Sequence, residues 1–232
     1  MTTVAVLQPG YLPWLGFFDQ MNRADVFVYY DDVQFDKHGW RNRNRVKGPN
    51  GPVWLTVPVL HKGRSNQLIK AVEVRNEQPW NIKHVRTIRE LYANAPFIKN
   101  YIGDLDSILV ETRSCLVDIC YKTTDYFREL LNIDTPIYRS SELDINGKRS
   151  QRLVELCKYF GADKYLSGNS AMAYLNTEYF DAAGIEVQWQ NYKHPIYNQQ
   201  HGPFLSHLSI VDLIMNLGPD SRNVISQIKL SD

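Results

Sequence analysis

The chain has 232 residues, of which 44% are hydrophobic and 12% aromatic, so it is long enough to bury a substantial core. Its 26 Lys and Arg against 25 Asp and Glu leave a net charge of +1, which argues against a general nucleic-acid coat or a polybasic membrane anchor. No segment approaches the ~20 apolar residues that span a bilayer, no signal-peptide pattern is present, and the three cysteines fit no zinc spacing. These features predict a cytoplasmic protein without membrane insertion.

The chain begins with an apolar run at residues 4–7, which predicts a short buried strand. A stiff turn follows at 8–14, Gln-Pro-Gly-Tyr-Leu-Pro-Trp, because proline fixes φ and glycine permits unusual backbone shapes. A helix is expected from Trp14 onward. Ligands of α/β proteins bind at such junctions, so Gln8, Tyr11 and Trp14 are candidate site residues. The alternative is a proline-rich turn that only packs aromatic side chains.

A second buried strand is predicted at residues 24–30, and it ends on Asp31 and Asp32. Two carboxylates at the carboxyl end of a strand are placed either to bind Mg²⁺ or to act in catalysis. They are equally suited to capping the turn that follows, because aspartate favours strand ends.

A cationic segment comes next. Arg41, Arg43, Arg45 and Lys47 recur with period two, so in an extended chain they project to one face. Trp40, Asn42, Asn44 and Val46 would then project to the other. Arginine forks fit phosphate or carboxylate oxygens, so this face predicts an anion site, more suited to a phosphorylated small molecule than to a nucleic acid. The alternative is a solvated basic edge strand. The full set of candidate residues in this region is Gln34, Lys37, His38, Arg41, Asn42, Arg43 and Arg45.

The middle of the chain changes period. A turn at 49–52, a strand at 53–59, a polar loop at 61–66 and a strand at 68–74 are expected. From residue 79 the apolar residues recur at helical spacing, and helices are predicted from 79 to about 92, at 98–109 and at 116–131. His84 is expected to be packed or exposed within the first of these helices, and Cys115 and Cys120 to be core thiols.

Alternating strands and helices return in the last third of the chain. The predicted order is a short strand at 137–138, a helix capped by Ser150, a strand at 164–166, a helix ending near Gly184 and a strand at 185–189. The small polar loop Ser167, Gly168 and Asn169 is a candidate anion-binding loop, although Ser-Gly-Asn is also ordinary turn chemistry. A helix over 209–217 follows, and His201 and His207 before it are candidate ligand-binding or acid–base groups.

These elements predict one α/β domain over residues 1–232, with a mostly parallel, Rossmann-like sheet, flanking helices and a helical subregion at about 79–131.

The ordered segments resemble the WbqC-like family. The resemblance lies in the turn at 8–16, in 24–28, 31–35, 40–43, 54–58 and 165–168, and in 208–213 with Asn216 and Gly218. That family occurs in bacteria, often among genes for surface-polysaccharide and O-antigen synthesis. The resemblance implies transfer of a glycyl or other acyl group to an amino sugar. Many members have histidine immediately before the Gln-Pro pair, whereas this chain has Leu7, so no catalytic histidine carries over.

The first fifth of the chain also resembles pantothenate synthetase and related nucleotidylyl-transfer folds. Those enzymes activate a carboxylate with ATP and pass it to an amine, so this second resemblance implies ATP as a cofactor, and Mg²⁺ is the ion that Asp31 and Asp32 are suited to bind. The histidine pair of the nucleotidylyl-transfer signature is missing here.

Two functions are therefore expected. The first is an acyl or aminoacyl transferase acting on a phosphorylated or nucleotide-linked amino sugar. In it Arg41, Arg43 and Arg45 hold phosphates, Gln8 and Tyr11 orient the substrate, and the catalytic set includes Asp31, Asp32 and His38. The alternative is a non-catalytic binding or assembly protein of a glycan pathway.

Overall fold

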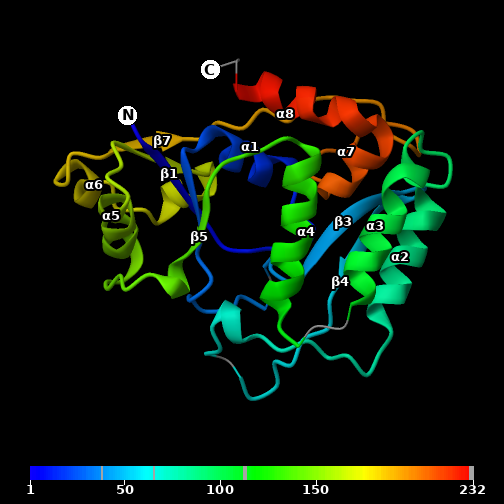
Figure 1. Ribbon diagram of the computed structural model, residues 1–232, viewed down its shortest axis with the longest axis horizontal. Coiled ribbons are helices and arrows are strands. Elements are labelled where there is room, and N and C mark those ends of the chain that lie inside the picture. Colours follow the sequence, from blue (N-terminus) through cyan, green and yellow to red (C-terminus); the bar gives the residue numbers. More distant parts are fainter. Residues whose placement is uncertain (38, 65, 112–113, 230–232) are drawn as a thin grey trace.

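The computed structural model describes residues 1–37, 39–64, 66–111 and 114–229. Five parallel strands form one sheet in the order β5-β2-β1-β6-β7 (Figure 1). The strands are β1 (Thr3–Leu7), β2 (Val26–Tyr29), β5 (Ile137–Arg139), β6 (Lys164–Ser167) and β7 (Glu186–Trp189). The predicted α/β class with a parallel sheet is confirmed.

Each face of the sheet is covered by its own apolar core, because alternate residues of a strand point to opposite faces. Ala5, Phe27 and Leu166 belong to the larger core, and their neighbours Val4, Val28 and Tyr165 belong to the smaller one. The helices of the larger core include α1 (Leu15–Arg23), α4 (Leu116–Leu130), α7 (Ile210–Leu217) and α8 (Ser221–Lys229). The smaller core is covered by α5 (Arg149–Tyr159) and α6 (Glu178–Asp181).

A separate two-stranded antiparallel hairpin lies beside the sheet. It consists of β3 (Arg43–Gly48) and β4 (Gly51–Thr56), and it packs against α7 and α2 (Trp80–Leu91). Helix α3 (Ile98–Val110) packs on α2 and completes this side of the molecule. The inward face of the hairpin carries Asn44, Val46 and Leu55, all buried. None of the helices in the described ranges is both long enough and apolar enough to cross a membrane.

Most predicted elements are found with ends within three residues of those expected, but three differ. Residues 68–74 do not form a strand; they contain the short 3-10 helix η1 (Ile69–Ala71), because the amides of Ile69 and Lys70 donate to carbonyls of the segment that follows β2. Ser150 is not the cap of α5: its Oγ accepts from the Asn176 amide instead. Helix α8 was not predicted.

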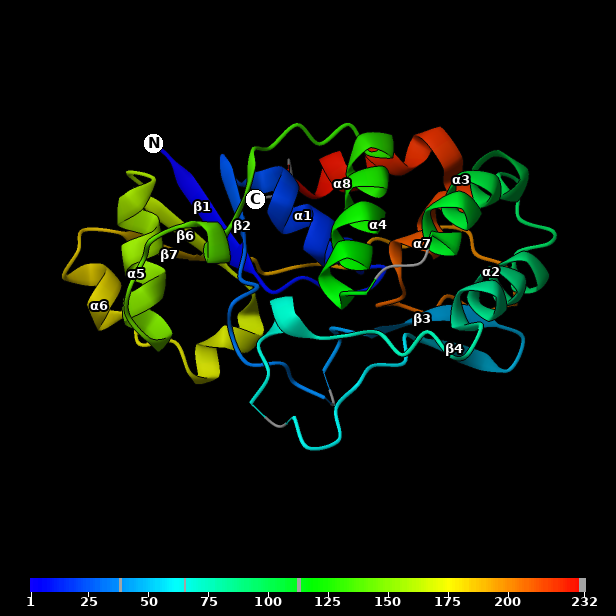
Figure 2. The same ribbon diagram turned by 60° about the horizontal axis from the view of Figure 1, so that its bottom comes forward.

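The carboxyl ends of all five strands lie at one edge of the sheet, since the strands are parallel. This edge faces the lower part of Figure 1 and comes forward in Figure 2, where the segments at 57–64 and 66–75 lie on the same side of the molecule. The 3-10 helices η2 (Ser140–Glu142) and η3 (Asn169–Ala173) start directly after β5 and β6 at the same edge.

Candidate functional site

The carboxyl edge has a switch point between β1 and β6. From β1 the chain goes to β2 on one side, and after β5 it crosses to β6 on the other. Open parallel sheets bind ligands in the crevice outside such a point, because the two loops leave the sheet in opposite directions. Gln8 follows β1 and Gly168 follows β6, so both predicted loops flank the switch point.

The turn after β1 is held by the segment that leads into the hairpin. The Tyr11 amide donates to the Arg41 carbonyl at 3.0 Å, and the Asn44 side chain donates to the Leu12 carbonyl at 2.7 Å. Leu12 has a φ of 46°, a conformation rare for a residue other than glycine. A Cβ on Gly10 would lie 3.1 Å from the Trp40 carbonyl oxygen, so this position favours glycine.

Gln8 is the side chain of this turn that is available to a ligand. It is half-buried at the end of β1, and its amide group makes no hydrogen bond to any of the residues that the structure describes. Only its backbone carbonyl is engaged, by the Arg41 guanidinium at 3.1 Å. Gln8 therefore offers a donor and an acceptor next to a cation.

Tyr11 belongs to the core. Its side chain is fully buried, and its hydroxyl lies 2.9 Å from Nδ1 of the buried His84. Burial raises the pKa of Tyr11 well above its usual value. Burial lowers the pKa of His84 to about 4, opposed in part by a hydrogen bond with the Thr56 backbone. Both groups are neutral at pH 7 and buried, so of the two expected surroundings of His84, packed or exposed, the structure shows the packed one.

Arg41 is a half-buried cation without a counter-charge among the described residues. Its Nε is buried and has no acceptor, and among the described residues no carboxylate oxygen lies within 4 Å of its guanidinium. Burial lowers the pKa of Arg41; Cys120, Asp36 and Tyr174 act in the opposite direction from longer range. The Cys120 thiol is neutral at pH 7, since burial raises its pKa to about 12. A buried charge without a partner is costly, so this position indicates an anionic ligand.

Asp31 accepts hydrogen bonds at both oxygens. Donors to the carboxylate are the Tyr121 hydroxyl (3.0 Å), the Ser140 hydroxyl (3.1 Å), and the Ser141 amide and hydroxyl (3.0 and 2.6 Å). These bonds join the end of β2 to α4 and to η2 after β5.

Asp32 forms a two-pronged ion pair with Arg152 of α5, at 2.9 and 2.5 Å, and also accepts from Ser140 at 2.6 Å. Burial favours a higher pKa for Asp32, but the bonds from Arg152 and Ser140 outweigh it and lower the pKa. Arg152 also lies over the ring of Tyr30, 5.3 Å from its centroid.

These two carboxylates do not offer Mg²⁺ a free set of oxygens. No group of three or more His, Cys, Asp and Glu suited to a metal ion occurs within residues 1–37, 39–64, 66–111 and 114–229. Magnesium binding by Asp31 and Asp32 stays a prediction, and it would require their present hydrogen bonds to be exchanged for metal–oxygen bonds.

The period-two pattern of the cationic segment holds for its central part. Asn42 and Asn44 are buried, and Arg43 and Arg45 are half-exposed on the opposite face. Asn42 donates to the Val57 carbonyl at 2.9 Å, which makes it a brace of the hairpin. Two predictions here are wrong. Lys47 was expected on the anion-binding face, but it is 2% exposed and its Nζ donates to the Gly202 and Pro203 carbonyls. Trp40 was expected on the face opposite the arginines, but it lies on their side.

Trp40 and Trp54 form an exposed aromatic pair on the arginine side of the hairpin. Their ring centroids are 5.1 Å apart, and the side chains are 44% and 45% exposed. Trp54 was not singled out in the sequence, although the alternation of buried Leu55 and Val57 with Trp54 and Thr56 does place it on the polar face.

The remaining predicted residues have varied surroundings. Trp14 is half-buried and stacks on His207, with ring centroids 5.1 Å apart. His201 is fixed by a 2.6 Å contact between its Nε2 and the Leu91 carbonyl. Gln34 and Lys37 are exposed, and His38 lies outside the described residues.

The loop after β6 is tied to the loop after β7. Asn169 donates to the Asn191 side chain at 3.0 Å, and the Asn191 amide donates back to Asn169 at 2.8 Å. Beneath Gly168 lies a buried network that was not predicted, in which Gln190 donates to Asp19 and accepts from Gln20, at 2.7 Å each. The sequence holds no signal for this network, since Gln190 and Gln20 are 170 residues apart.

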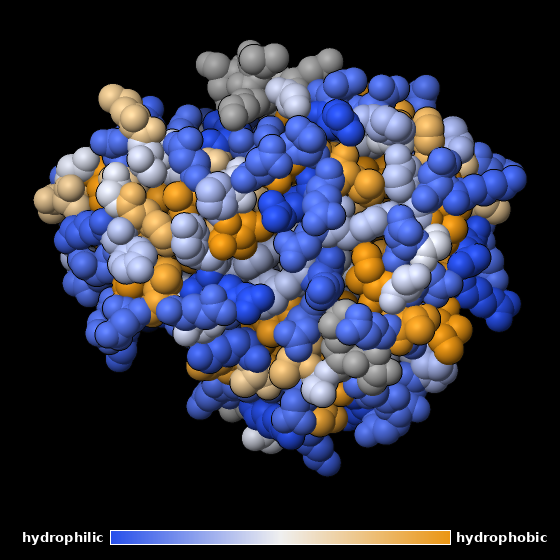
Figure 3. Space-filling view, in the orientation of Figure 1, coloured by the Kyte–Doolittle hydropathy of each residue, from blue (hydrophilic) through white to orange (hydrophobic). Residues whose placement is uncertain are grey.

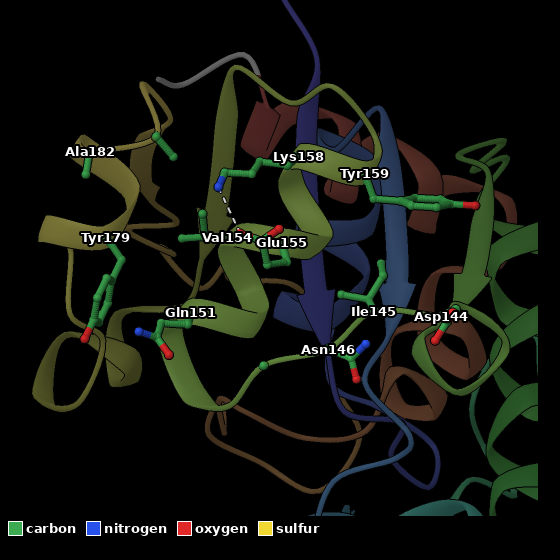
Figure 4. Close-up of a pocket in the computed structure, with 12 residues that line it drawn as sticks. Asp144, Ile145, Asn146, Gln151, Val154, Glu155, Lys158, Tyr159, Tyr179 and Ala182 are labelled. Carbon is green, nitrogen blue, oxygen red and sulfur yellow. Dashed lines mark hydrogen bonds and ion pairs between the residues drawn. The ribbon is translucent and has the colours of Figure 1, made fainter.

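One groove, of about 450 Å³, is lined by residues that include Tyr29, Tyr121 and Arg139, next to the ends of β2 and β5. Another, of about 910 Å³, lies beside α5 and α6, where Lys158 and Glu155 pair with each other and Tyr179 is exposed (Figure 4). None of the predicted site residues lines it. On the face shown in Figure 3, hydrophilic and hydrophobic side chains are interspersed. We place the candidate site at the carboxyl edge, because the unpaired cation and the free amide lie there.

Comparisons with known proteins show which family this chain resembles. The model of the WbqC-like protein family matches residues 8–224. A relative from Mycobacterium tuberculosis (strain ATCC 25618 / H37Rv), named uncharacterized protein Rv1507c, is 33% identical over 227 residues, which cover 97% of this chain and 98% of the relative. No solved structure gives a significant match.

Proposed function

The chain belongs to the WbqC-like protein family, and we propose that it is a transferase of bacterial surface-glycan (O-antigen) biosynthesis. Its substrate in this proposal is a phosphorylated or nucleotide-linked amino sugar, and the group transferred to the amine is glycyl or another acyl group. The reaction class comes from the family resemblance. The binding of an anionic ligand at the carboxyl edge comes from the side chains found there.

One observation carries the proposal: Arg41 is half-buried beside the end of β1, its Nε is buried without an acceptor, and it has no carboxylate partner among the described residues. Taking a charged group out of water without a partner is unfavourable, so a half-buried guanidinium with no counter-charge is suited to binding an anionic ligand. A phosphate or carboxylate group accepts two parallel N–H bonds from arginine. The substrate's anionic group would supply the missing charge.

Gln8 has the complementary role. The Arg41 guanidinium contacts its backbone carbonyl, and its side-chain amide, which has no partner among the described residues, is able to donate to a hydroxyl or carbonyl oxygen of the substrate and accept from an amine. This would orient the amino sugar at the end of β1. Tyr11, one residue beyond Gly10, contributes by packing: its hydroxyl is used by His84.

In the proposed step the amine nitrogen of the sugar attacks the acyl carbon. A C–N bond forms, the bond from the acyl carbon to its leaving group breaks, and the amine proton passes to a base or to water. If the acyl donor is a free amino acid, ATP must activate its carboxylate first, and the leaving group is then a phosphate or AMP. No described residue is assigned as the base.

The second candidate is a non-catalytic binder of the same sugar. It is favoured by a specific observation: the hydroxyl of Tyr11 and both oxygens of Asp31 are occupied by hydrogen bonds within the protein. A binder needs the anion contact at Arg41 and no further chemistry.

The first experiment measures binding. Titration calorimetry with glucosamine 1-phosphate and with UDP-glucosamine is run on the wild type, Arg41→Met and Arg86→Met. Arg86 is a surface arginine paired with Glu90, so it is the matched control. We expect Arg41→Met to lose at least tenfold in affinity and Arg86→Met to lose none. Equal affinity in all three proteins would show that Arg41 does not bind the sugar phosphate.

The second experiment separates the two candidates. The protein is incubated with the amino sugar, ATP, Mg²⁺ and an equimolar mixture of amino acids, and the sugar is analysed by mass spectrometry. A sugar that has gained one aminoacyl residue supports the transferase. Binding without any mass change, in this mixture and with acyl thioesters as donors, supports the binder.

A further inference from the structure

The exposed face of the β3–β4 hairpin has a composition that packing does not account for. Trp40, which precedes β3, and Trp54 of β4 lie there with their ring centroids 5.1 Å apart, and they are 44% and 45% exposed. Arg45 lies over both rings. These three residues are called the indole face below. Tryptophan is highly buried on average, so a contiguous pair of exposed indoles next to a candidate site indicates a surface that a ligand covers.

The indole face adjoins the candidate site through the backbone of Trp40. The Trp40 carbonyl oxygen would lie 3.1 Å from a Cβ on Gly10, in the turn after β1. The next residue, Arg41, donates from its guanidinium to the Gln8 carbonyl. Trp40 is therefore packed against the turn that carries Gln8, and a ligand that covers its ring would lie next to the segment that carries Arg41.

The protein itself uses more of the Trp54 ring than of the Trp40 ring. The guanidinium carbon of Arg43 lies 4.7 Å from the ring centroid of Trp54, and the Arg43 Nε donates to the Gly39 carbonyl at 3.3 Å. Arg43 is thus engaged within the protein, where it supports Trp54. Trp54 in turn lies behind Trp40, so we take Trp40 as the ring that is left for a ligand.

Arg45 supplies an unbalanced charge to the indole face. Within the described residues no carboxylate oxygen lies within 4 Å of its guanidinium, its Nε is buried without an acceptor, and its Nη2 has only a 3.3 Å bond to the His207 carbonyl. The guanidinium carbon lies 5.1 Å from the ring centroid of Trp40 and 5.6 Å from that of Trp54. Held by these rings, the arginine has less conformational freedom to lose when it binds an anion.

A simpler interpretation is a basic strand edge that prevents pairing with another sheet. Arg45, however, is directly opposite Trp54 in the register of the hairpin, and side chains of a strand project from the face of the sheet and not from its hydrogen-bonding edge. Exposed indoles on that face would favour association instead of preventing it. Protection of an edge therefore does not account for the indole face.

We propose that the indole face is a nucleotide-binding subsite, in which the nucleobase stacks on Trp40 and the phosphate of the same nucleotide binds Arg45. A nucleotide has both features that this face calls for, a flat ring and an anion held one ribose away from it. Every base has a π-face that stacks on an exposed aromatic side chain, and arginine is suited to phosphate oxygens. The proposal rests on the proposed function and deepens it: the amino sugar is nucleotide-linked, and Arg41 binds an anionic group nearer the sugar.

The experiment separates the two halves of a nucleotide. Calorimetric titrations use UMP, uridine, which lacks the phosphate, and ribose 5-phosphate, which lacks the base. They are run on the full-length wild type, on Trp40→Leu, Trp40→Phe and Arg45→Gln, and on two controls. The controls Tyr159→Leu and Arg86→Gln replace an aromatic residue and an arginine that are exposed elsewhere. Thermal unfolding of every variant is recorded in the same buffer.

We expect UMP to bind the wild type at least tenfold more tightly than either uridine or ribose 5-phosphate. Trp40→Leu should abolish the advantage over ribose 5-phosphate, and Arg45→Gln the advantage over uridine. Trp40→Phe keeps an aromatic ring, so it should retain most of the affinity for UMP. Both controls should bind UMP like the wild type, and Trp40→Leu should unfold at the same temperature, because the indole is exposed.

Two results would overturn the proposal: UMP binding the wild type no better than ribose 5-phosphate, or an unchanged affinity for UMP in Trp40→Leu. Glucose 1-phosphate binding through Trp40 in place of UMP would overturn it in favour of a sugar-ring site. Affinity for oligouridylate that rises with strand length above that of UMP would overturn it in favour of nucleic acid. Failure of the proposed function is distinguishable, since Arg41→Met would then bind glucosamine 1-phosphate as the wild type does while Trp40→Leu still weakens UMP.

Discussion

Arg152 and Asp32, 120 residues apart in the sequence, join α5 to the end of β2 through two parallel hydrogen bonds. The pair fixes the carboxyl end of β2 next to the switch point. Tyr30 lies under the Arg152 guanidinium, so the three side chains pack together where β2 ends.

Replacing Arg152 by methionine should destabilise the protein, because Asp32 then keeps only its bond from Ser140. The pair is partly exposed, so we expect a loss of ~1–3 kcal/mol in the free energy of unfolding, measured by urea titration at pH 7. Arg86→Met, which breaks the exposed pair with Glu90, should cost no more than ~0.5 kcal/mol.

The pH dependence of this pair follows from the lowered pKa of Asp32. A carboxylate with a depressed folded pKa stabilises the protein above its unfolded pKa, ~3.9, and this contribution is lost as the pH falls through the folded value. The difference in the free energy of unfolding between the wild type and Arg152→Met should therefore become smaller below about pH 4. A difference that stays constant down to pH 3 would contradict the ion pair as its cause.

His84 should make the protein less stable on mild acidification. Its folded pKa of about 4 lies below the ~6.5 of an exposed histidine, so between these values only the unfolded chain binds the proton. Stability from this group is complete above about pH 6.5 and falls by up to ~3 kcal/mol toward pH 4. His84→Leu should flatten the stability curve in that window. Tyr11→Phe, the matched variant, should lower stability by ~1 kcal/mol and keep the slope.

The substitution Asp212→Asn should lower the free energy of unfolding more than an Asp→Asn substitution at an exposed position does. The buried Asp212 carboxylate accepts from the hydroxyls of Tyr92 (2.7 Å) and Tyr197 (2.8 Å) and from Gln199 (2.8 Å). An asparagine amide turns an acceptor into a donor facing these donors, at a cost of ~2–4 kcal/mol. Asp220→Asn, at an exposed position, should change stability by less than ~0.5 kcal/mol. Equal unfolding midpoints in the two variants would rule out this network as a source of stability.

Gly10→Ala tests the close approach between the turn and the cationic segment. The added Cβ would lie 3.1 Å from a backbone oxygen, that of Trp40, which is not free to rotate away as a side chain is. We expect a loss of ~1 kcal/mol in stability together with weaker binding of glucosamine 1-phosphate, because the segment carrying Arg41 must shift. Gly161→Ala has a positive φ but no atom within 4 Å, so it should lower stability without affecting binding.

The sequence predicted the strands and most helices because their signals are local. The alternation of Asn42, Asn44 and Val46 with the arginines specifies both faces of β3, and the apolar spacing of Val85, Ile88 and Tyr92 specifies the buried side of α2. The strand predicted at 68–74 was wrong because its alternation resembled a strand, whereas tertiary hydrogen bonds to Asp31 and Val33 impose a 3-10 turn.

The candidate site was predictable only where a residue's role does not depend on a distant partner. The position of Gln8 follows from the strand and turn alone. That Asp32 is paired, that Lys47 is bound to Gly202 and Pro203, and that Tyr11 faces His84 depend on contacts across 73 to 156 residues. A single sequence holds no record of such contacts, so the sequence alone does not show that the protein itself engages these side chains.

The hydrogen bond from the Tyr11 amide to the Arg41 carbonyl provides a way to observe the site directly. The same arginine donates from its guanidinium to the Gln8 carbonyl, so the end of β1 and the cationic segment are joined twice. Hydrogen–deuterium exchange at the Tyr11 amide therefore reports how often this junction opens. A ligand that neutralises Arg41 should slow that exchange, and it would do so whichever reaction, or none, follows binding.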